Sequence, residues 1–229
     1  MNVKMKIIKV KDKSEVVLEA KTLLYKYCNS KTVLFLSGGS TPKELYKILA
    51  SEKKLKIGLS AIVDERFGPK MHEGSNEKMI KDSGLFKYFK VFNIPIQTIL
   101  IGKDIESTAR EYEEKIININ KTYKQKIAIL GIGEDGHTAG ISSGFKNSNK
   151  FVVSIDNFPS EYKQRITLTF KALEKLDKLI LLVLGKEKLE ALTKMFKKGS
   201  IKDLPARFYM KKEISEKTIL ITDQDLVLE

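Results

Sequence analysis

The segment "TVLFLSGGSTPKELY" at residues 32–46 contains a strand, a glycine turn and a helix start in direct succession. Its first residues are apolar almost throughout, which is typical of a strand that is covered on both faces in a parallel sheet. Thr41 is the expected N-cap, Pro42 fits the first helical position, and Glu44 completes a capping box. The segment therefore predicts a strand that runs directly into a well-defined helix.

The same alternation of apolar runs and amphipathic stretches continues along the chain. The pattern predicts strands at 32–37, 58–65, 98–102, 126–133, 151–155, 165–170 and 178–185, and helices at 13–28, 42–50, 76–82, 105–117 and 186–197. This order predicts an α/β, doubly wound, Rossmann-like fold, in which helices flank a mostly parallel sheet through right-handed crossovers. The sequence has no repeat and no Pro/Gly-rich linker, so we expect one domain over residues 1–229.

Composition narrows the class of protein. A chain of 229 residues with 42% hydrophobic and 31% charged residues is long enough to bury a core without disulfides or metals. The single cysteine, Cys28, cannot form an internal disulfide, and the lysine-rich N-terminus lacks the apolar stretch of a secretory signal. The longest apolar run, 179–185, is too short to span a bilayer. We expect a cytoplasmic protein without a membrane partner, either a monomer or a weak homodimer.

The formal net charge of +13 admits two interpretations. A nucleic-acid-binding protein has such a balance. However, the excess consists mostly of lysine spread over the whole chain, and arginine occurs only at Arg66, Arg110, Arg165 and Arg207. We therefore favour a lysine-rich surface without a nucleic-acid partner, whose positive field would attract a small anionic substrate.

Ligands of doubly wound proteins bind outside the carboxyl ends of the strands, so polar motifs that follow strands are the candidate sites. The first is Gly38, Gly39, Ser40 and Thr41, after the strand at 32–37. Two glycines allow backbone N–H groups to approach an anion at a helix N-terminus. The segment is neither a Walker A loop nor a G-x-G-x-x-G motif, and an ordinary strand-to-helix turn is the alternative.

The second candidate is "VDERFGPKMHEGSN" at 63–76. Asp64 and Arg66 lie where a strand ends, and the Arg66 guanidinium can bind a phosphate or carboxylate through two N–H groups. A D-E-R tripeptide is also commonly a solvated charge cluster. His72 follows in the loop, where we favour a structural role that places Arg66.

The third candidate is "GIGEDGHTAG" at 131–140, after the predicted strand at 126–133. Its glycines allow a tight turn that presents His137 at the end of the strand, and Asp135 is close enough in sequence to orient an imidazole. A lone histidine is often structural, so both roles stay open for His137 on these residues alone. Two histidines without partner cysteines give no metal-site spacing, so we predict no metal site.

The fourth candidate consists of Arg165, which opens the strand at 165–170, and Lys188, which follows the strand at 178–185. Either cation can hold an anion. Each, taken alone, is equally explained as a surface charge.

Five segments together resemble the 6-phosphogluconolactonase family: "SGGSTP" (37–42), "DERFGPKMHEGSN" (64–76), "GIGEDGHTAG" (131–140), "RITLT" (165–169) and "GKEK" (185–188). They occur in the family's order, and with "LPARF" (204–208) the resemblance spans residues 32–208. Single motifs of this kind are common, whereas five in order are specific. The resemblance implies a fold of the sugar-phosphate isomerase/lactonase type.

The resemblance also implies an activity, the hydrolysis of 6-phospho-D-glucono-1,5-lactone to 6-phosphogluconate in the oxidative pentose phosphate pathway, without a cofactor. It implies that His137 activates the attacking water, while Asp135 positions the imidazole or a sugar hydroxyl. The residues that it implies for binding the substrate and its phosphate are Gly38, Gly39, Ser40, Thr41, Asp64, Arg66, Arg165 and Lys188.

Two alternatives accompany this interpretation. Aminosugar-6-phosphate isomerase/deaminases share the S-G-G-S-T-P loop but typically carry D-E-Y and G-H-I-A-F-N-E-P, so Arg66 and Thr138 favour the lactonase. A non-catalytic sugar-phosphate-binding protein is the other. The lactonase pattern usually continues H-T-A-S-L-F-P, whereas this chain has "HTAGISSG" (137–144) and no tryptophan. We therefore expect the pocket wall beyond His137 to differ from that of the family.

Overall fold

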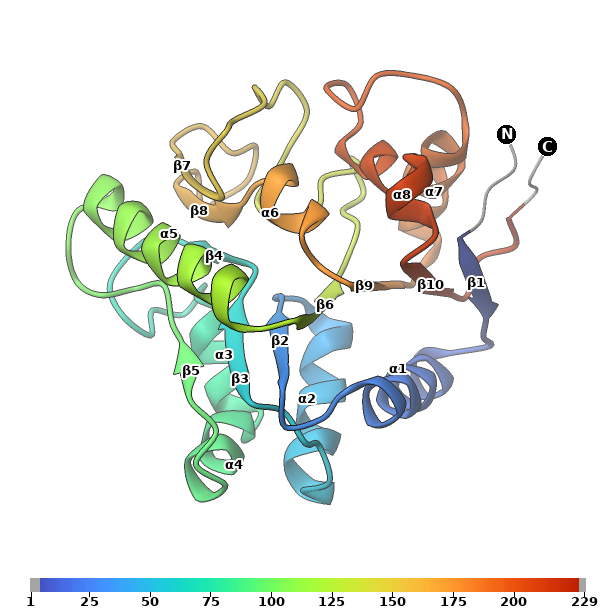
Figure 1. The fold of residues 1–229 in the computed structure, drawn as a ribbon. Helices are drawn as coiled ribbons and strands as arrows, with labels where there is room; N and C mark the ends of the chain where they lie inside the picture. The colour runs from blue at the N-terminus through green and yellow to red at the C-terminus, as the bar shows by residue number, and fades with distance from the viewer. Residues whose placement is uncertain (1–4, 227–229) are drawn as a thin grey trace.

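The computed structural model describes residues 5–226, and its centre is a seven-stranded sheet in which every strand pairing is parallel. The strand order is β1-β10-β9-β6-β2-β3-β5 (Figure 1). The strands are β1 Lys6–Lys9, β2 Thr32–Leu36, β3 Leu59–Ile62, β5 Ile96–Gln97, β6 Gln125–Leu130, β9 Lys178–Val183 and β10 Thr218–Thr222. The central strands β2, β3, β6 and β9 are buried along almost their whole length, as their apolar runs predict.

Helices lie on both sides of this sheet, α1 to α4 on one side and α5 to α8 on the other (Figure 1). They are α1 Lys13–Tyr27, α2 Ser40–Glu52, α3 Asn76–Asp82, α4 Leu85–Val91, α5 Ile105–Thr122, α6 Phe170–Glu174, α7 Leu189–Phe196 and α8 Lys212–Ser215, with 3₁₀ turns η1 Lys186–Lys188 and η2 Pro205–Met210. The doubly wound α/β prediction is therefore confirmed.

The strand order locates the point where a ligand is expected. From β2 the chain proceeds through α2 to β3 and β5, whereas from β6 it proceeds in the opposite direction to β9 and β10. With right-handed crossovers, the connections that follow β2 and β6 leave the sheet on opposite sides. Because β2 and β6 are neighbours, a crevice opens between the segments that follow them.

The predicted strand at 98–102 is wrong. The fifth strand comprises only Ile96–Gln97, and the backbone N–H groups of Ile99 and Leu100 donate to Oε1 of the buried Glu77 at 2.5 and 3.0 Å. Because a carboxylate takes these donors, they are not available to a neighbouring strand.

The predicted strands at 151–155 and 165–170 belong not to the parallel sheet but to a second, three-stranded antiparallel sheet. Its order is β4-β8-β7, with β4 Asp64–Arg66, β7 Val152–Ile155 and β8 Arg165–Leu168. Antiparallel sheets tolerate one solvated face, and β7 is accordingly only partly buried. The predicted strand at 165–170 also ends early, because Thr169 caps α6 through its side chain.

The predicted capping box at the start of α2 is wrong as well. The helix begins at Ser40, and its N-cap is Gly39, at φ +116°, without any side-chain cap hydrogen bond among residues 5–226. This φ lies in the region that favours glycine, so the chain turns into the helix two residues earlier than Thr41 would allow. The N–H groups of the first helical turn are consequently left without a side-chain acceptor.

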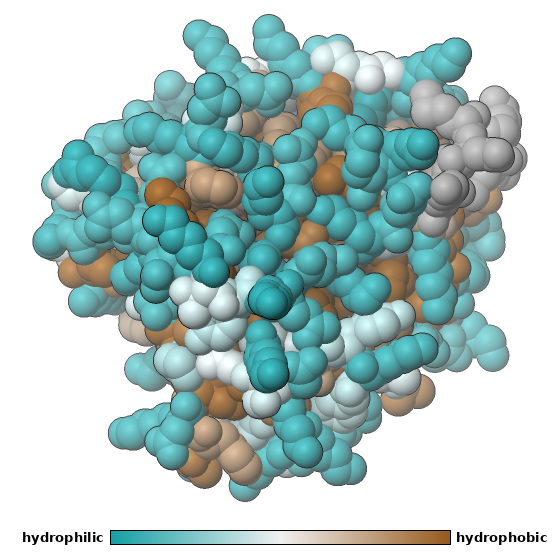
Figure 2. Space-filling model, viewed as in Figure 1, coloured by the Kyte–Doolittle hydropathy of each residue, from teal (hydrophilic) through white to brown (hydrophobic). Residues whose placement is uncertain are grey.

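Hydrophilic side chains cover most of the face in Figure 2. Large hydrophobic side chains that are exposed within the described range are Leu18, Val91, Phe92 and Leu189. None of the helices in this range is both long enough and apolar enough to cross a membrane.

Candidate active site

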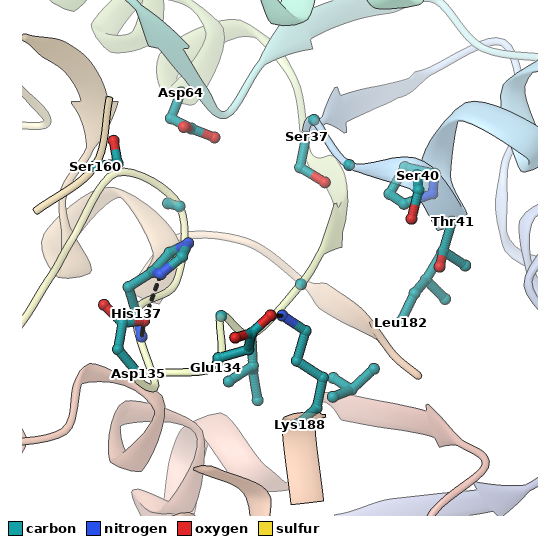
Figure 3. Close-up of a pocket in the computed structure, with 18 of the residues that line it drawn as sticks. Ser37, Ser40, Thr41, Asp64, Glu134, Asp135, His137, Ser160, Leu182 and Lys188 are labelled. Atoms are coloured by element: carbon teal, nitrogen blue, oxygen red, sulfur yellow. Dashed lines mark hydrogen bonds and ion pairs between the residues drawn. The ribbon is translucent and has the colours of Figure 1, made fainter. Parts of the chain in front are cut away.

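A pocket of about 730 Å³ opens at the crevice between β2 and β6 (Figure 3). All ten residues that the sequence predicted for the site line it: Gly38, Gly39, Ser40, Thr41, Asp64, Arg66, Asp135, His137, Arg165 and Lys188. Nine of them meet because β9, β6, β2 and β3 are neighbours in the sheet, so that the segments following their carboxyl ends converge. Arg165 opens β8 and joins them through the pairing of β8 with β4. His72 does not belong to this lining.

The segment after β2 forms one wall of the pocket. A Cβ on Gly38 would lie 2.0 Å from the Oδ1 of Asn76, so only glycine fits there. Asn76 is itself held in place, because its Nδ2 donates to the backbone oxygen of Asp64 at 2.8 Å. The Ser37 Oγ is buried in this wall without a hydrogen-bond partner among the described residues.

The segment after β6 presents His137 from the opposite wall. The Asp135 Oδ1 lies 2.6 Å from His137 Nδ1 and also accepts the His137 backbone N–H at 3.1 Å. The hydrogen bond with His137 lowers the pKa of Asp135 to about 2, so the carboxylate is ionised at neutral pH. An ionised carboxylate only accepts hydrogen bonds, so Nδ1 carries the proton of a neutral imidazole and Nε2 keeps its lone pair.

Buried contacts brace this segment from behind. Gly136 adopts φ +80°, and its backbone oxygen accepts the Ala206 N–H at 3.0 Å. The Thr138 Oγ1 donates to the backbone oxygen of Gly131 at 3.0 Å and lies 2.5 Å from the hydroxyl of the fully buried Tyr209. The position of His137 therefore depends on contacts with residues some seventy positions further along the chain.

Tyr209→Phe should lower kcat without preventing folding. Loss of one buried hydrogen bond costs about 1 kcal/mol in the free energy of unfolding. A loosened segment around Thr138 misplaces His137, so we expect kcat to fall by up to about tenfold, measured beside thermal unfolding. Tyr88→Phe is the matched control, because the buried Tyr88 hydroxyl bonds the Leu55 backbone oxygen and lies outside the pocket lining. Equal kcat in the two variants would contradict the role given to Tyr209.

The pleat of β4 separates its three charged residues. Successive strand side chains point to opposite faces, so Asp64 and Arg66 share the pocket side while Glu65 points away from them. Burial raises the pKa of Asp64, which is only 6% exposed. The Arg66 Nη1 donates to the Gly74 backbone oxygen at 2.7 Å, and its Nε is buried without a partner among residues 5–226.

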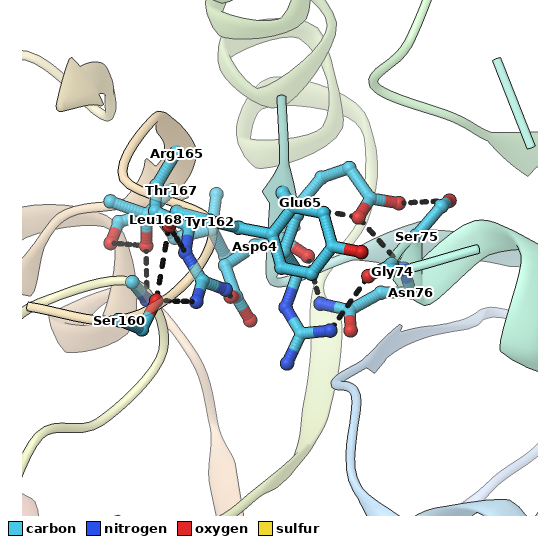
Figure 4. A network of polar contacts seen from close by, with 12 residues as sticks. Asp64, Glu65, Gly74, Ser75, Asn76, Ser160, Tyr162, Arg165, Thr167 and Leu168 are labelled. Atoms are coloured by element: carbon cyan, nitrogen blue, oxygen red, sulfur yellow. Dashed lines mark hydrogen bonds and ion pairs between the residues drawn. The ribbon is translucent and has the colours of Figure 1, made fainter. Parts of the chain in front are cut away.

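Glu65 is completely buried and organises the start of α3 (Figure 4). Its Oε1 accepts the N–H groups of Arg66 and Asn76 at 2.7 Å each, and its Oε2 accepts Ser75 Oγ at 2.9 Å and the Glu77 N–H at 2.8 Å. Sequence reasoning missed this residue. Ser75 and Asn76 were the available sequence signal, because they predict a helix start whose free N–H groups need a hydrogen-bond acceptor.

Arg165 is built into the wall more deeply than the sequence suggested. Its Nη2 donates to Ser160 Oγ at 2.8 Å, its Nε donates to the Tyr162 backbone oxygen at 3.1 Å, and its Nη1 lies 3.9 Å from Asp64 Oδ2 (Figure 4). The guanidinium also covers the ring of Phe158 at 4.4 Å. Two of its five N–H donors are therefore used within the protein, and its charge faces Asp64.

Lys188, at the end of η1, is paired with an acid of the segment after β6. Its Nζ lies 3.4 Å from Glu134 Oε1, and both residues line the pocket (Figure 3). The Lys188 side chain is 22% exposed and that of Glu134 is 68% exposed, so the pair is readily opened by a competing anion.

His72 has the structural role that we favoured. Its Nε2 lies 2.9 Å from the backbone oxygen of Arg66, and its ring packs beside Tyr162 with centroids 5.4 Å apart. Gly74, in the same loop, accepts the hydrogen bond of the Arg66 guanidinium. The loop thus holds Arg66 from both its backbone and its side chain.

Comparison with known proteins identifies the group to which this arrangement belongs. Fold and pocket together define a doubly wound α/β protein with a crevice at its switch point that glycines, a histidine and charged side chains of both signs line. The family model for glucosamine-6-phosphate isomerases/6-phosphogluconolactonase matches residues 13–220. The chain therefore belongs to this family.

Some relatives are named as lactonases and others as deaminases. A 6-phosphogluconolactonase of Thermotoga maritima is 32% identical over 90% of this chain and 88% of its own length. A glucosamine-6-phosphate deaminase of Clostridium novyi is 29% identical over 96% of this chain and 98% of its own length. A crystal structure of a 6-phosphogluconolactonase from Thermotoga maritima matches with a TM-score of 0.77 and 30% identity, and the match covers 95% of this chain and 99% of that one.

Proposed function

We propose that this protein hydrolyses 6-phospho-D-glucono-1,5-lactone to 6-phosphogluconate in the oxidative pentose phosphate pathway. The observation that carries the proposal is the pair of His137 and Asp135, 2.6 Å apart, at the edge of a crevice whose opposite wall is an open helix start. Relatives named 6-phosphogluconolactonase over most of this chain's length support the same reaction.

The geometry suits general base catalysis by His137. Nε2 accepts a proton from a water molecule as its oxygen attacks the lactone carbonyl, and Asp135 stabilises the resulting imidazolium. When the tetrahedral intermediate collapses, the C1–O5 bond breaks and Nε2–H returns the proton to the departing ring oxygen. The histidine regains its initial state, and no external acid or base is consumed.

We assign the substrate phosphate to the segment Gly38 to Thr41, with Arg66 and Lys188 as its cations. The N–H groups of the first turn of α2 have no side-chain acceptor, and a helix N-terminus favours an anion. Ser37 Oγ and Arg66 Nε add two buried donors that lack partners among the described residues. Buried polar groups are normally hydrogen-bonded, so these donors favour a ligand with several acceptor oxygens.

The two remaining predicted residues act beside this phosphate site. Arg165 adds positive charge from the wall, although two of its five N–H groups bind Ser160 and Tyr162. The Asp64 carboxylate faces the pocket, where it can accept hydrogen bonds from sugar hydroxyls.

A second candidate function is the isomerisation and deamination of an aminosugar 6-phosphate. The match to the Clostridium novyi deaminase over 96% of this chain favours it. Both reactions need the same kind of phosphate site, but their products differ, since only the deaminase releases ammonia.

The decisive experiment measures both reactions at controlled pH. We expect acid release from 6-phospho-D-glucono-1,5-lactone well above a protein-free blank, which is required because the lactone also opens spontaneously. We expect no ammonia from glucosamine 6-phosphate. Ammonia release without lactone hydrolysis would establish the second candidate, and tight 6-phosphogluconate binding without either reaction would indicate a binding protein.

Lys188→Ala tests the phosphate assignment. Loss of one charge-assisted hydrogen bond of about 1.5–3 kcal/mol should raise the KM for the lactone roughly tenfold or more, with a smaller effect on kcat. Lys186→Ala is the matched control, because Lys186 is exposed and does not line the pocket. Glu134→Gln removes the competing anion and should lower KM by no more than about fivefold, since a pair this exposed is weak. An unchanged KM in Lys188→Ala would refute the assignment.

A further inference from the structure

The pocket wall beside His137 comes from an unexpected part of the chain. After Ala139, the segment 140–144, where the sequence leaves the lactonase pattern, contributes nothing to the pocket lining. Phe158, Pro159 and Ser160, in the connection between β7 and β8, line it instead. This connection is about twenty residues away from His137 in sequence and reaches it only through the fold.

Phe158 of this connection packs against the imidazole. Its ring meets that of His137 edge-on, with centroids 5.3 Å apart and an interplanar angle of 84°. It also packs under the Arg165 guanidinium at 4.4 Å, and it is only 3% exposed. An aromatic pair of this geometry and a cation over a ring are both attractive beyond the area that they bury.

The connection that carries Phe158 is itself anchored. Arg165 binds Ser160 Oγ and the Tyr162 backbone oxygen, and the Phe158 N–H donates to the Lys163 backbone oxygen at 2.8 Å. Phe158 is therefore a rigid support rather than a loop side chain that merely happens to lie near the site.

His137 has two supports in this arrangement. Asp135 fixes the ring through Nδ1, but one hydrogen bond leaves the imidazole free to tilt about it. Phe158 contacts the ring itself and limits this movement. We propose that Phe158 is a positioning residue for His137, which holds the imidazole so that Nε2 faces the lactone carbonyl. The proposal rests on the lactonase function proposed above.

Kinetics of Phe158→Ala and Phe158→Leu test the proposal. Misplacement of a catalytic group by about 1 Å costs up to 10²-fold, so we expect kcat of Phe158→Ala to fall about tenfold or more. KM and inhibition by inorganic phosphate should change less than about twofold, because the phosphate segment is untouched. Phe158→Leu, which refills most of the volume, should recover much of kcat. The control is Phe145→Ala, since Phe145 packs on Phe170 outside the pocket lining and should lower only thermal stability.

An NMR measurement separates this proposal from the function on which it rests. The chain has two histidines, so imidazole spectra contain two sets of signals, and His72 serves as an internal reference beside Tyr162. Loss of the Phe158 ring current should shift the His137 signals in Phe158→Ala and leave those of His72 in place. Wild-type kcat in Phe158→Ala, or unmoved His137 signals, would overturn the proposal. If the His137 signals shift in Phe158→Ala but the wild-type protein has no lactonase activity, only the proposed function is overturned.

Discussion

His137→Ala should abolish most of the lactone hydrolysis, with kcat reduced roughly 10²–10⁴-fold. The physical reason is that, in the proposed mechanism, Nε2 removes a proton from water and returns it to the ring oxygen. The proposed phosphate site lies on the opposite wall, so KM and inhibition by inorganic phosphate should change little. Stopped-flow or pH-stat assays with subtraction of the spontaneous reaction measure this directly.

His72→Gln is the matched control for this experiment. Both variants lose one of the two histidines, but His72 bonds the Arg66 backbone oxygen outside the pocket lining. We expect its kcat to fall by less than about tenfold, through a small displacement of Arg66. If His137→Ala keeps the wild-type rate, or if the two variants lose equal activity, His137 is not the general base.

Glu65→Gln should destabilise the protein more than any single exchange of an exposed glutamate. The Glu65 side chain makes four hydrogen bonds, two at each oxygen (Figure 4). At pH 5.5, below its pKa of about 7, the protonated oxygen can donate to Ser75 Oγ and still accept the Glu77 N–H. An amide NH₂ in place of Oε2 can still bond Ser75, but it leaves the buried Glu77 N–H without an acceptor. Such a group costs about 1–3 kcal/mol in the free energy of unfolding, measured by urea denaturation at pH 5.5. Glu213→Gln, at an exposed position, should have an effect below about 0.5 kcal/mol.

The pH dependence of stability provides a second test of Glu65. Burial raises the pKa of Glu65 to about 7, above its value in the unfolded chain. The folded state therefore binds the Glu65 proton more tightly than the unfolded chain does. The resulting stabilisation of the folded state is complete below about pH 4.5 and is lost as the pH rises through about 7. The difference in unfolding free energy between wild type and Glu65→Gln should accordingly narrow from pH 5.5 to pH 8. A difference that widens over this range would contradict the assignment. Asp64 and Glu77 titrate in both proteins, so they affect the two unfolding free energies alike.

The sequence determined the order of strands and helices, and through it the location of the site. Apolar runs such as 126–133 and 178–185 must be buried on both faces, and parallel strands place their carboxyl ends at one edge of the sheet. Polar motifs that directly follow these runs, with Gly38 and His137 among them, therefore reach the same pocket. Local chemistry and the handedness of crossovers suffice for this conclusion.

The local sequence pattern predicted the wrong secondary structure in two places. The segment 98–102 has strand composition, but the Glu77 carboxylate binds its N–H groups. The capping box around Thr41 is a sound motif, but Gly39 at φ +116° allows an earlier helix start. In both cases the winning interaction depends on a backbone geometry that residue types alone do not reveal.

The tertiary structure alone determined the orientation and the contacts of the site residues. The pairing of β4 with β8 turns Asp64 and Arg66 towards the pocket and Glu65 into the interior, and it places Arg165 against Asp64. The connection before β8 brings Phe158 against His137 across about twenty residues of chain. Sequence proximity determines which residues follow a strand, whereas contacts between separate elements form only when the whole core packs, and these contacts set the orientation of each functional group.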